Sequence, residues 1–208
     1  MAINLKKGQT INLRKEEHDL SRVTIGLGWD IQPEPKRGFF SLFKSPPSDF
    51  DLDAVAVLLD QNGKILERGN ERLQGGDVIF FNNLKHRSGY LWHTGDNLTG
   101  QGEGDDEQII VNLERMYPQF HRILFLVSIY QGMSKSQHFG LLENAYIRAV
   151  DAQSKEILRF QLDQAPEYQD MCTMCFGEVY RQDSGWKFRA LGEAYPDDSF
   201  LPIIKRYF

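Results

Sequence analysis

The segment from residue 95 to residue 107 concentrates oxygen ligands. It reads GDNLTGQGEGDDE and contains no Lys or Arg. Its side-chain oxygens lie at two ends, with Asp96 and Asn97 at one and Asp105, Asp106 and Glu107 at the other. Calcium takes about six to eight oxygen ligands from carboxylates, amides, backbone carbonyls and water. The glycines between the two ends, at alternate positions from 100 to 104, let the backbone curl and aim its carbonyls inward. The segment therefore predicts a site for one or two calcium ions.

Other metals fit this composition less well. The segment is not an EF-hand loop, because the third and fifth positions counted from Asp96 are Leu98 and Gly100. Magnesium usually keeps several waters and uses fewer protein ligands. Zinc and copper prefer imidazole or thiolate, and the segment has no His or Cys. Without a cation the carboxylates repel one another, so we expect the segment to become ordered when metal binds.

A second acidic cluster precedes an apolar run. Asp49, Asp51 and Asp53 alternate with apolar residues, and a strand would place all three on one face. Asp30, after the segment GLGW, is a further candidate. Each aspartate taken alone is equally consistent with a solvated strand end. Taken with the glycine-rich segment, Asp30, Asp51 and Asp53 are predicted to share in metal binding.

Composition restricts the class of protein. The chain has 208 residues, a formal net charge of −5, and 41% hydrophobic residues, which is a globular composition. A net negative charge argues against nucleic acid as the main partner. The first residues, MAINLKKGQTINL, contain no contiguous apolar run of the kind a signal peptide needs, and no stretch is long enough to span a bilayer. We therefore expect a cytoplasmic protein.

The hydrophobic pattern indicates strands. Alternating segments such as 23–27, 158–162 and 186–190 follow a period of two, and the apolar runs 54–59 and 123–130 suit strands that are buried on both faces. Helical signals are confined to 113–120 and to 197–207, which contains Pro202. We predict an all-β fold, a two-sheet β-sandwich with a few short helices, formed as a single domain over residues 1–208.

Two features stand apart from this pattern. The segment 31–48 contains four prolines and the apolar sequence FFSLF at 39–43. It is interpreted either as a loop that folds back on the sandwich or as an exposed apolar tip that contacts a partner or a membrane surface. Cys172 and Cys175 have C-x-x-C spacing, but the chain has no second ligand pair for zinc, so we interpret them as structural thiols.

The sequence resembles the TerD-like proteins of bacterial tellurite-resistance and stress operons. The matching segments cover nearly the whole chain, and the pattern GDNLTG-x-G-x-GDDE is the most specific of them. The segments are VTIGLGWD, DFDLDAVAVLLDQNGK, IFFNNL, HTGDNLTGQGEGDDEQIIVNL, FGLLENAYIRAVD and GEVYRQDSGWKFRALGEAY. The proline-rich segment 31–48 and the sequence MCTMC depart from the family pattern.

The resemblance implies a calcium-binding, non-catalytic β-sandwich that acts in the cytoplasm in resistance to tellurite and other stress, with other proteins of the same system as partners. The family's metal-binding segments fall on Asp96, Asn97, the backbone around Gly100 and Gly102, Asp105, Asp106 and Glu107, with Asp30, Asp51 and Asp53 nearby. The alternative is an enzyme, a metal-assisted phosphoesterase. It would need a cationic group beside the metal, for which His93, Lys85 and Arg87 are the candidates.

Overall fold

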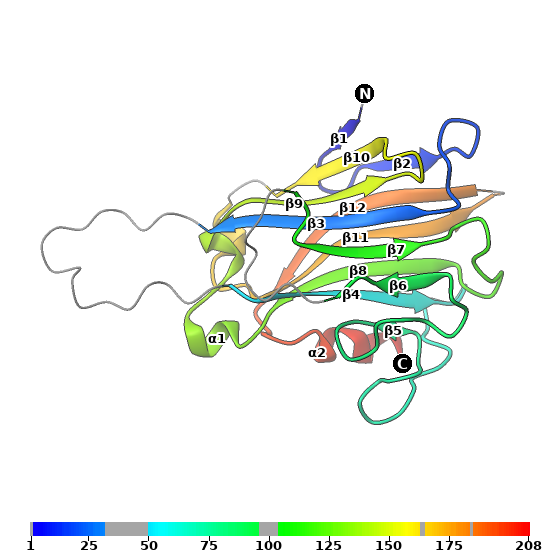
Figure 1. Ribbon diagram of the computed structural model, residues 1–208. Helices are drawn as coiled ribbons and strands as arrows, with labels where there is room; N and C mark the ends of the chain where they lie inside the picture. Colours follow the sequence, from blue (N-terminus) through cyan, green and yellow to red (C-terminus); the bar gives the residue numbers. More distant parts are fainter. Residues whose placement is uncertain (1, 32–49, 96–103, 163–164, 184) are drawn as a thin grey trace, which may run out of the picture.

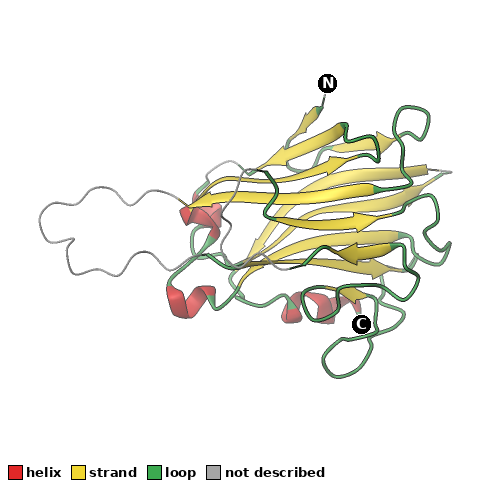
Figure 2. Cartoon of the chain, in the orientation of Figure 1, coloured by secondary structure: helices red, strands yellow, loops and turns green. Residues whose placement is uncertain are grey.

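Two six-stranded sheets face each other in the computed structural model, which describes residues 2–31, 50–95, 104–162, 165–183 and 185–208 (Figure 1). Sheet A has the strand order β1-β10-β9-β3-β7-β6, and sheet B has the order β2-β12-β11-β8-β4-β5. Neighbouring strands are antiparallel, except that β1 and β10 are parallel. Figure 2 shows that helices are few and lie outside the two layers of strands.

The strands of sheet A are β1 (Ile3–Leu5), β3 (Val23–Ile31), β6 (Leu91–His93), β7 (Glu107–Val111), β9 (Leu142–Val150) and β10 (Glu156–Gln161). Those of sheet B are β2 (Thr10–Leu13), β4 (Leu52–Leu59), β5 (Val78–Ile79), β8 (Arg122–Ile129), β11 (Thr173–Gln182) and β12 (Gly185–Tyr195). The α-helices are α1 (Gly132–Lys135) and α2 (Leu201–Ile204), and the 3₁₀-helices are Phe139–Leu141, Pro166–Tyr168 and Lys205–Tyr207.

Two apolar layers hold this architecture together. The larger layer lies between the sheets, where alternate residues of β3 (Val23, Ile25, Leu27) pack against β4 and β8 side chains. The smaller layer lies on the outer face of sheet B, where Val55 and Val57 of β4 meet the C-terminal helices. Strand β4 is consequently buried on both faces, as its continuous apolar sequence predicts.

The predicted all-β sandwich with few short helices is confirmed, but one predicted helix is wrong. Residues 113–120 form turns, not a helix. Their carbonyls accept hydrogen bonds from side chains: Leu113 O from Trp186, and Met116 O and Phe120 O from Arg181. These side-chain donors replace the backbone donors that a helix would have supplied.

The C-terminal helix is present and short. It runs as α2 and then as the 3₁₀-helix Lys205–Tyr207. Pro202 lies in the first turn of α2, where its missing N–H leaves no hydrogen bond unmade, so it begins this helix instead of interrupting it. No helix among the described residues has the length and apolar content that crossing a bilayer requires. The predicted insertion 31–48 lies, apart from the backbone of Ile31, outside the described residues.

Candidate metal centre

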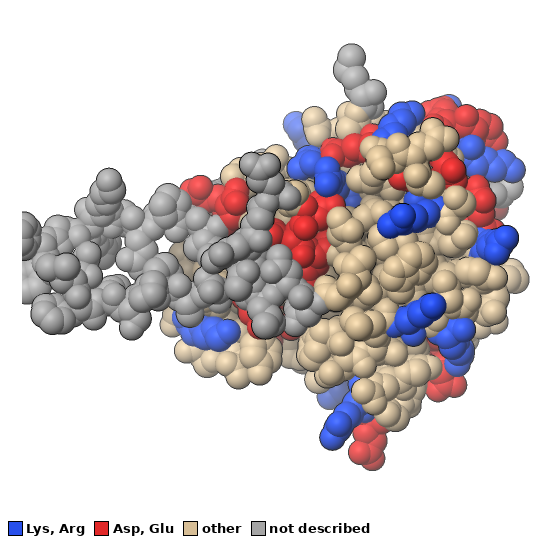
Figure 3. All heavy atoms as spheres, in the orientation of Figure 1, with Lys and Arg blue, Asp and Glu red and all other residues tan. Residues whose placement is uncertain are grey.

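The acidic residues that follow the glycine-rich segment lie where β3 ends and β7 begins, next to each other in sheet A. Acidic atoms gather over this part of the molecular surface (Figure 3). Of the ten predicted site residues, six are described: Asp30, Asp51, Asp53, Asp105, Asp106 and Glu107. Asp96, Asn97, Gly100 and Gly102 lie outside the described residues. The three consecutive acids 105–107 face three different environments.

The Asp105 carboxylate is held against the outer face of sheet A. Its Oδ1 accepts hydrogen bonds from Arg148 Nε at 2.7 Å and from the Tyr146 hydroxyl at 3.0 Å. Its Oδ2 accepts from a terminal nitrogen of Arg148 at 3.1 Å and from Gln108 at 3.2 Å. Although the Asp105 side chain is only 1% exposed, both of its oxygens therefore have protein partners.

The glycines of β3 make this arrangement possible. A Cβ on Gly26 would lie 2.1 Å from Asp105 Oδ2, and a Cβ on Gly28 would lie 2.5 Å from the Tyr146 hydroxyl oxygen. The carboxylate and the phenol therefore lie directly over the backbone of β3, in space that any other residue type would fill. The sequence GLGWD thus has a packing reason for its two glycines.

Arg148 continues into a network of alternating charge on the same face. It also bonds Glu156 at 3.1 Å, and Glu156 in turn binds Arg159. We call Asp105, Arg148, Glu156 and Arg159 the Arg148 network. Hydrogen bonding to Asp105 raises the pKa of Arg148, and burial and the Asp105 charge raise the pKa of Tyr146 to about 12. Although the acidic segment itself contains no Lys or Arg, the pairing of β9 with β3 brings Arg148 to Asp105 from a distant part of the sequence.

Asp106 is in a different situation. Its Oδ2 accepts the backbone N–H of Trp29 at 3.0 Å, and its own N–H donates to Leu27 O at 2.8 Å. Burial raises the pKa of Asp106, and the negative charges of Asp30 and Asp105 raise it further, against the opposing effect of the Trp29 hydrogen bond. In the part of the chain that is described, no Lys or Arg nitrogen lies within 4.0 Å of Asp30 or Asp106.

Asp30 reaches this position through an irregularity in the sheet. The register of β3 on β9 shifts between Gly28 and Asp30, and such a bulge redirects a side chain. Asp30 Oδ2 accepts a hydrogen bond from Asn144 Nδ2 at 2.8 Å, and Glu143 lies opposite Asp30 in the register of the two strands. We call Asp30 and Asp106 the Asp30–Asp106 pair.

Glu107 points inward, on the same side of β7 as Ile109 and Val111. Its Oε2 accepts the N–H of Ala54 in β4 at 2.5 Å and lies 3.6 Å from His93 Nε2. His93 Nδ1 accepts the N–H of Gly95 at 3.0 Å. The Ala54–Glu107 hydrogen bond ties sheet B to sheet A, and the contact of Glu107 with His93, whose side chains are each 1% exposed, lies within sheet A.

Asp51 and Asp53 precede and begin β4. Their neighbours Phe50, Leu52 and Ala54 pack in the layer between the sheets, so alternation directs the two aspartates to the other face of sheet B. There Asp53 is buried and lies opposite Ser128 of β8. The period-two prediction that these aspartates share a face agrees with this packing. Among the described residues, no three His, Cys, Asp or Glu side chains gather as a set that could hold a metal ion.

Four residues of β9 in this region do not stand out in the sequence as site residues: Glu143, Asn144, Tyr146 and Arg148. They lie in a segment with clear alternation, which is the one signal that places Tyr146 and Arg148 on a common face. Nothing in the sequence says that this strand pairs with β3. Of the cationic groups named for the enzyme alternative, Arg87 pairs with Glu67 and Asp77, His93 contacts the predicted ligand Glu107, and Lys85 is exposed.

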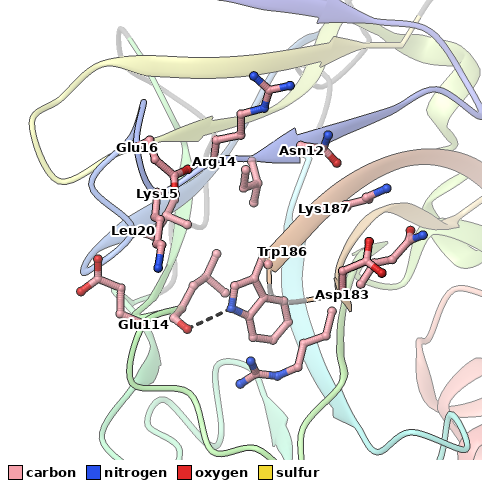
Figure 4. A pocket seen from close by; sticks show the side chains of 14 residues that line it. Asn12, Arg14, Lys15, Glu16, Leu20, Glu114, Asp183, Trp186 and Lys187 are labelled. Atoms are coloured by element: carbon pink, nitrogen blue, oxygen red, sulfur yellow. Dashed lines mark hydrogen bonds between the residues drawn. The ribbon is translucent and has the colours of Figure 1, made fainter.

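A separate hollow of about 660 Å³ contains none of the described predicted ligands. Trp186 forms part of its lining, and its indole N–H donates to Leu113 O at 3.0 Å (Figure 4). The Arg181 guanidinium lies 4.2 Å from the ring centroid of Trp186. The remaining lining mixes acidic and basic side chains, among them Arg14, Glu16 and Lys187. Of its polar groups, Trp186 and Arg181 bind backbone carbonyls of the residues 113–120.

Comparison with known proteins identifies relatives along the full length. The family model described as TerD domain matches residues 1–207. The chain is 47% identical to tellurium resistance protein TerX of Serratia marcescens and 41% identical to stress response protein SCP2 of Bacillus subtilis (strain 168), and both alignments cover 100% of both chains. A crystal structure of a homologue of telluride resistance protein (TerD) from Streptomyces coelicolor A3(2) has the same fold, with a TM-score of 0.61 at 23% identity, covering 87% of this chain and 94% of that one.

Proposed function

The chain belongs to the TerD domain family, whose relatives named above are tellurium-resistance and stress-response proteins, and on this premise we propose that it is a calcium-binding, non-catalytic protein of such a bacterial system. In this proposal the metal-loaded protein is a binding or scaffold module for other proteins of the same system. Calcium enters at the segment 95–107, and the acidic residues beside it supply its oxygens.

The Asp30–Asp106 pair is the observation that carries the proposal. The negative charge of the exposed Asp30 helps to raise the pKa of the partly buried Asp106, and no described Lys or Arg nitrogen lies within 4.0 Å of either carboxylate. A divalent cation would relieve this repulsion, and carboxylate oxygens are the ligands that calcium prefers. Asp96, Asn97 and the backbone of Gly100 and Gly102 belong to the segment that enters Asp105 and Asp106, and they complete the proposed ligand set at this pair. Glu107, Asp51 and Asp53 are also predicted ligands, but Glu107 lies between the sheets and the two aspartates face the outer side of sheet B, so the structure does not bring them to this pair.

We give Asp105 a second role in this set. Because its oxygens bond to Arg148, Tyr146 and Gln108, its main effect is to fix the end of the segment over Gly26. Asp106, the next residue, is then held beside Asp30. The bound calcium would supply charge neutralisation and would order the segment, in keeping with the link between metal binding and folding.

The test is calcium binding in matched variants. Native mass spectrometry before and after chelation counts the ions, and calorimetry together with thermal melts gives the affinity and the stabilisation. Asp106→Asn and Asp30→Asn should each lower calcium affinity by at least about tenfold, since each removes one anionic ligand of a hard cation. Asp105→Asn should change calcium affinity less than either of these.

The matched control is Glu16→Gln, which removes one negative charge from the exposed loop between β2 and β3, at the opposite end of β3 from Asp30. Its calcium response should equal that of the unmodified protein. An unmodified protein that stays metal-free in millimolar calcium would refute the proposal. If Glu16→Gln and Asp106→Asn lowered calcium affinity equally, the assignment of the site to the Asp30–Asp106 pair would be wrong.

A further inference from the structure

A second hollow lies on the outer face of sheet B, away from the Asp30–Asp106 pair on sheet A. It is about 360 Å³ in volume and is lined from the start of β4, the segment after β5, the end of β8 and the start of α2. Figure 1 shows α2 near β5, the edge strand of this sheet. Small-molecule sites in proteins have volumes of roughly 300–1,000 Å³, so the hollow has the size of a site for a small ligand.

Aromatic side chains form its walls. Phe80 packs edge-on against Phe81, with ring centroids 5.2 Å apart, and against Phe200 at 5.3 Å. Phe81 is 39% exposed, Tyr130 46% and Leu201 43%, and all three line this one hollow. Exposed large apolar side chains scattered singly need no explanation, whereas a group of them around one concave surface marks a binding site.

The charge of the lining favours a cation. Asp53 lines the hollow although the residue is only 9% exposed, and Glu71 and Asp198 add two more carboxylates. Arg72 is the single Lys or Arg among the described lining residues. The Tyr130 ring already attracts an ammonium group, since Lys135 Nζ lies 5.2 Å from its centroid. Aromatic faces beside carboxylates are the combination by which proteins bind organic cations.

We propose that this hollow binds a small organic cation, an ammonium group carried on an apolar body. The body would lie against Phe81, Tyr130 and Leu201, and the ammonium group would face Asp53. Neutral molecules with the same body lack the attraction to the carboxylates and to the π-face, and anions are repelled. The selection for charge is therefore the signature of the site.

Three probes with the same aromatic body measure this selection: phenethylamine, phenethyl alcohol and phenylacetate. Ligand-detected NMR and calorimetry on the full chain should give an affinity for the amine about tenfold above that for the alcohol, with phenylacetate weakest. The titrations are run with chelator and again with saturating calcium, because the sequence also predicts Asp53 as a calcium ligand. Equal affinity for the amine and the alcohol in both conditions would overturn the proposal.

Variants place the binding in this hollow. Asp53→Asn should reduce the preference for amine over alcohol to about twofold or less, whereas Glu16→Gln, in the hollow around Trp186, should keep it. Tyr130→Leu replaces the aromatic ring with an apolar side chain. It should weaken binding of the amine and leave the calcium-induced shift in melting temperature unchanged. Asp198→Asn repeats the charge test at the rim if Asp53→Asn does not fold.

Two results would contradict this placement. The first is a preference for the amine over the alcohol that persists both in Asp53→Asn (or in Asp198→Asn, if Asp53→Asn does not fold) and in Tyr130→Leu. The other is an amine preference lost in Glu16→Gln, which would move the binding to the other hollow. Loss of calcium binding with the amine preference intact would refute the calcium proposal alone, so the two proposals fail separately.

Discussion

Asp105 and Asp106 are adjacent in sequence and chemically alike, yet the fold treats their charges in opposite ways. Arg148 and Tyr146, both from β9, surround the Asp105 carboxylate with hydrogen-bond donors. The Asp30–Asp106 pair brings two carboxylates together and supplies one backbone N–H to Asp106 and one amide to Asp30. The Asp105 charge is neutralised by Arg148, whereas Asp106 keeps a negative neighbour that raises its pKa.

This difference assigns two roles to neighbouring acidic residues, one in positioning the backbone and one in binding a cation. Charges that are neutralised by the fold fix the position of the backbone, and they do so whether or not metal is present. Two carboxylates without such a partner repel each other, and this repulsion destabilises the folded protein unless a cation binds between them. The comparison predicts opposite responses to mutation, to pH and to calcium in residues that are neighbours along the chain.

The largest effect is expected from Arg148→Met. It leaves the buried Asp105 carboxylate without its bidentate partner, and we expect the free energy of unfolding to fall by about 2–3 kcal/mol. The Arg148 side chain is 26% exposed, so the loss should be below that for a fully buried pair. Urea unfolding measures it. Arg159→Met, which breaks a more exposed pair with Glu156, should cost less than about 1 kcal/mol, and equal losses would contradict the comparison.

Gly26→Ala tests the same contact from the other side. Its Cβ must displace the Asp105 carboxylate, and overpacking of this kind costs roughly 1–3 kcal/mol. Gly185→Ala is the control, because a Cβ there meets nothing within 4 Å. Since Gly26→Ala and Arg148→Met break one ion pair, their combined effect should be smaller than their sum. Additive losses in the double mutant would separate the glycine from the ion pair.

The third prediction concerns sign. In chelator, Asp105→Asn should lower the free energy of unfolding, because it weakens a charged hydrogen-bonded pair. Asp106→Asn should leave it unchanged or raise it by up to about 1 kcal/mol, because it removes repulsion from Asp30 while an amide oxygen can still accept from Trp29. Thermal and urea unfolding of the two variants measure the difference. Two losses of similar size would show that Asp106 is neutralised like Asp105.

The smallest effect is a pair of opposite pH dependences. Hydrogen bonds from Arg159 and Arg148 lower the pKa of Glu156 in the folded protein. Its contribution to stability is therefore present above about pH 4.5, the ordinary pKa of a glutamate, and is lost as the pH falls through the lowered pKa of the folded state. Burial, with the charges of Asp30 and Asp105, raises the pKa of Asp106. Its cost is absent below about 3.8 and grows as the pH rises through the raised folded value.

Unfolding free energies compared with those of Glu156→Gln and Asp106→Asn, from about pH 3 to pH 7 in chelator, isolate the two contributions. The difference between the unmodified protein and Glu156→Gln should grow in favour of the unmodified protein as the pH rises. The difference for Asp106→Asn should grow in favour of the variant. If both free-energy differences changed with pH in the same direction, Glu156 and Asp106 would not differ as proposed.

Secondary structure was largely readable from the sequence because alternation and apolar runs report burial directly. The strand β4 is continuous in apolar residues and buried on both faces, and β3 places Val23, Ile25 and Leu27 in the core. The segment 113–120 was misread because its carbonyls bind Trp186 and Arg181, which are distant in sequence. Helix formation there was decided by partners that no local pattern contains.

The sequence by itself determined the two-sheet sandwich, the acidic glycine-rich segment and the resemblance to the TerD family, because each is written in residue order and spacing. Only the tertiary structure decided which carboxylates face a cation of the protein. The pairing of β9 with β3 brings Arg148 to Asp105, whereas Asp106 has the negative charge of Asp30 nearby, which raises its pKa. Charge interactions depend on distance through space, and the strands that meet in a sheet are not neighbours in the chain.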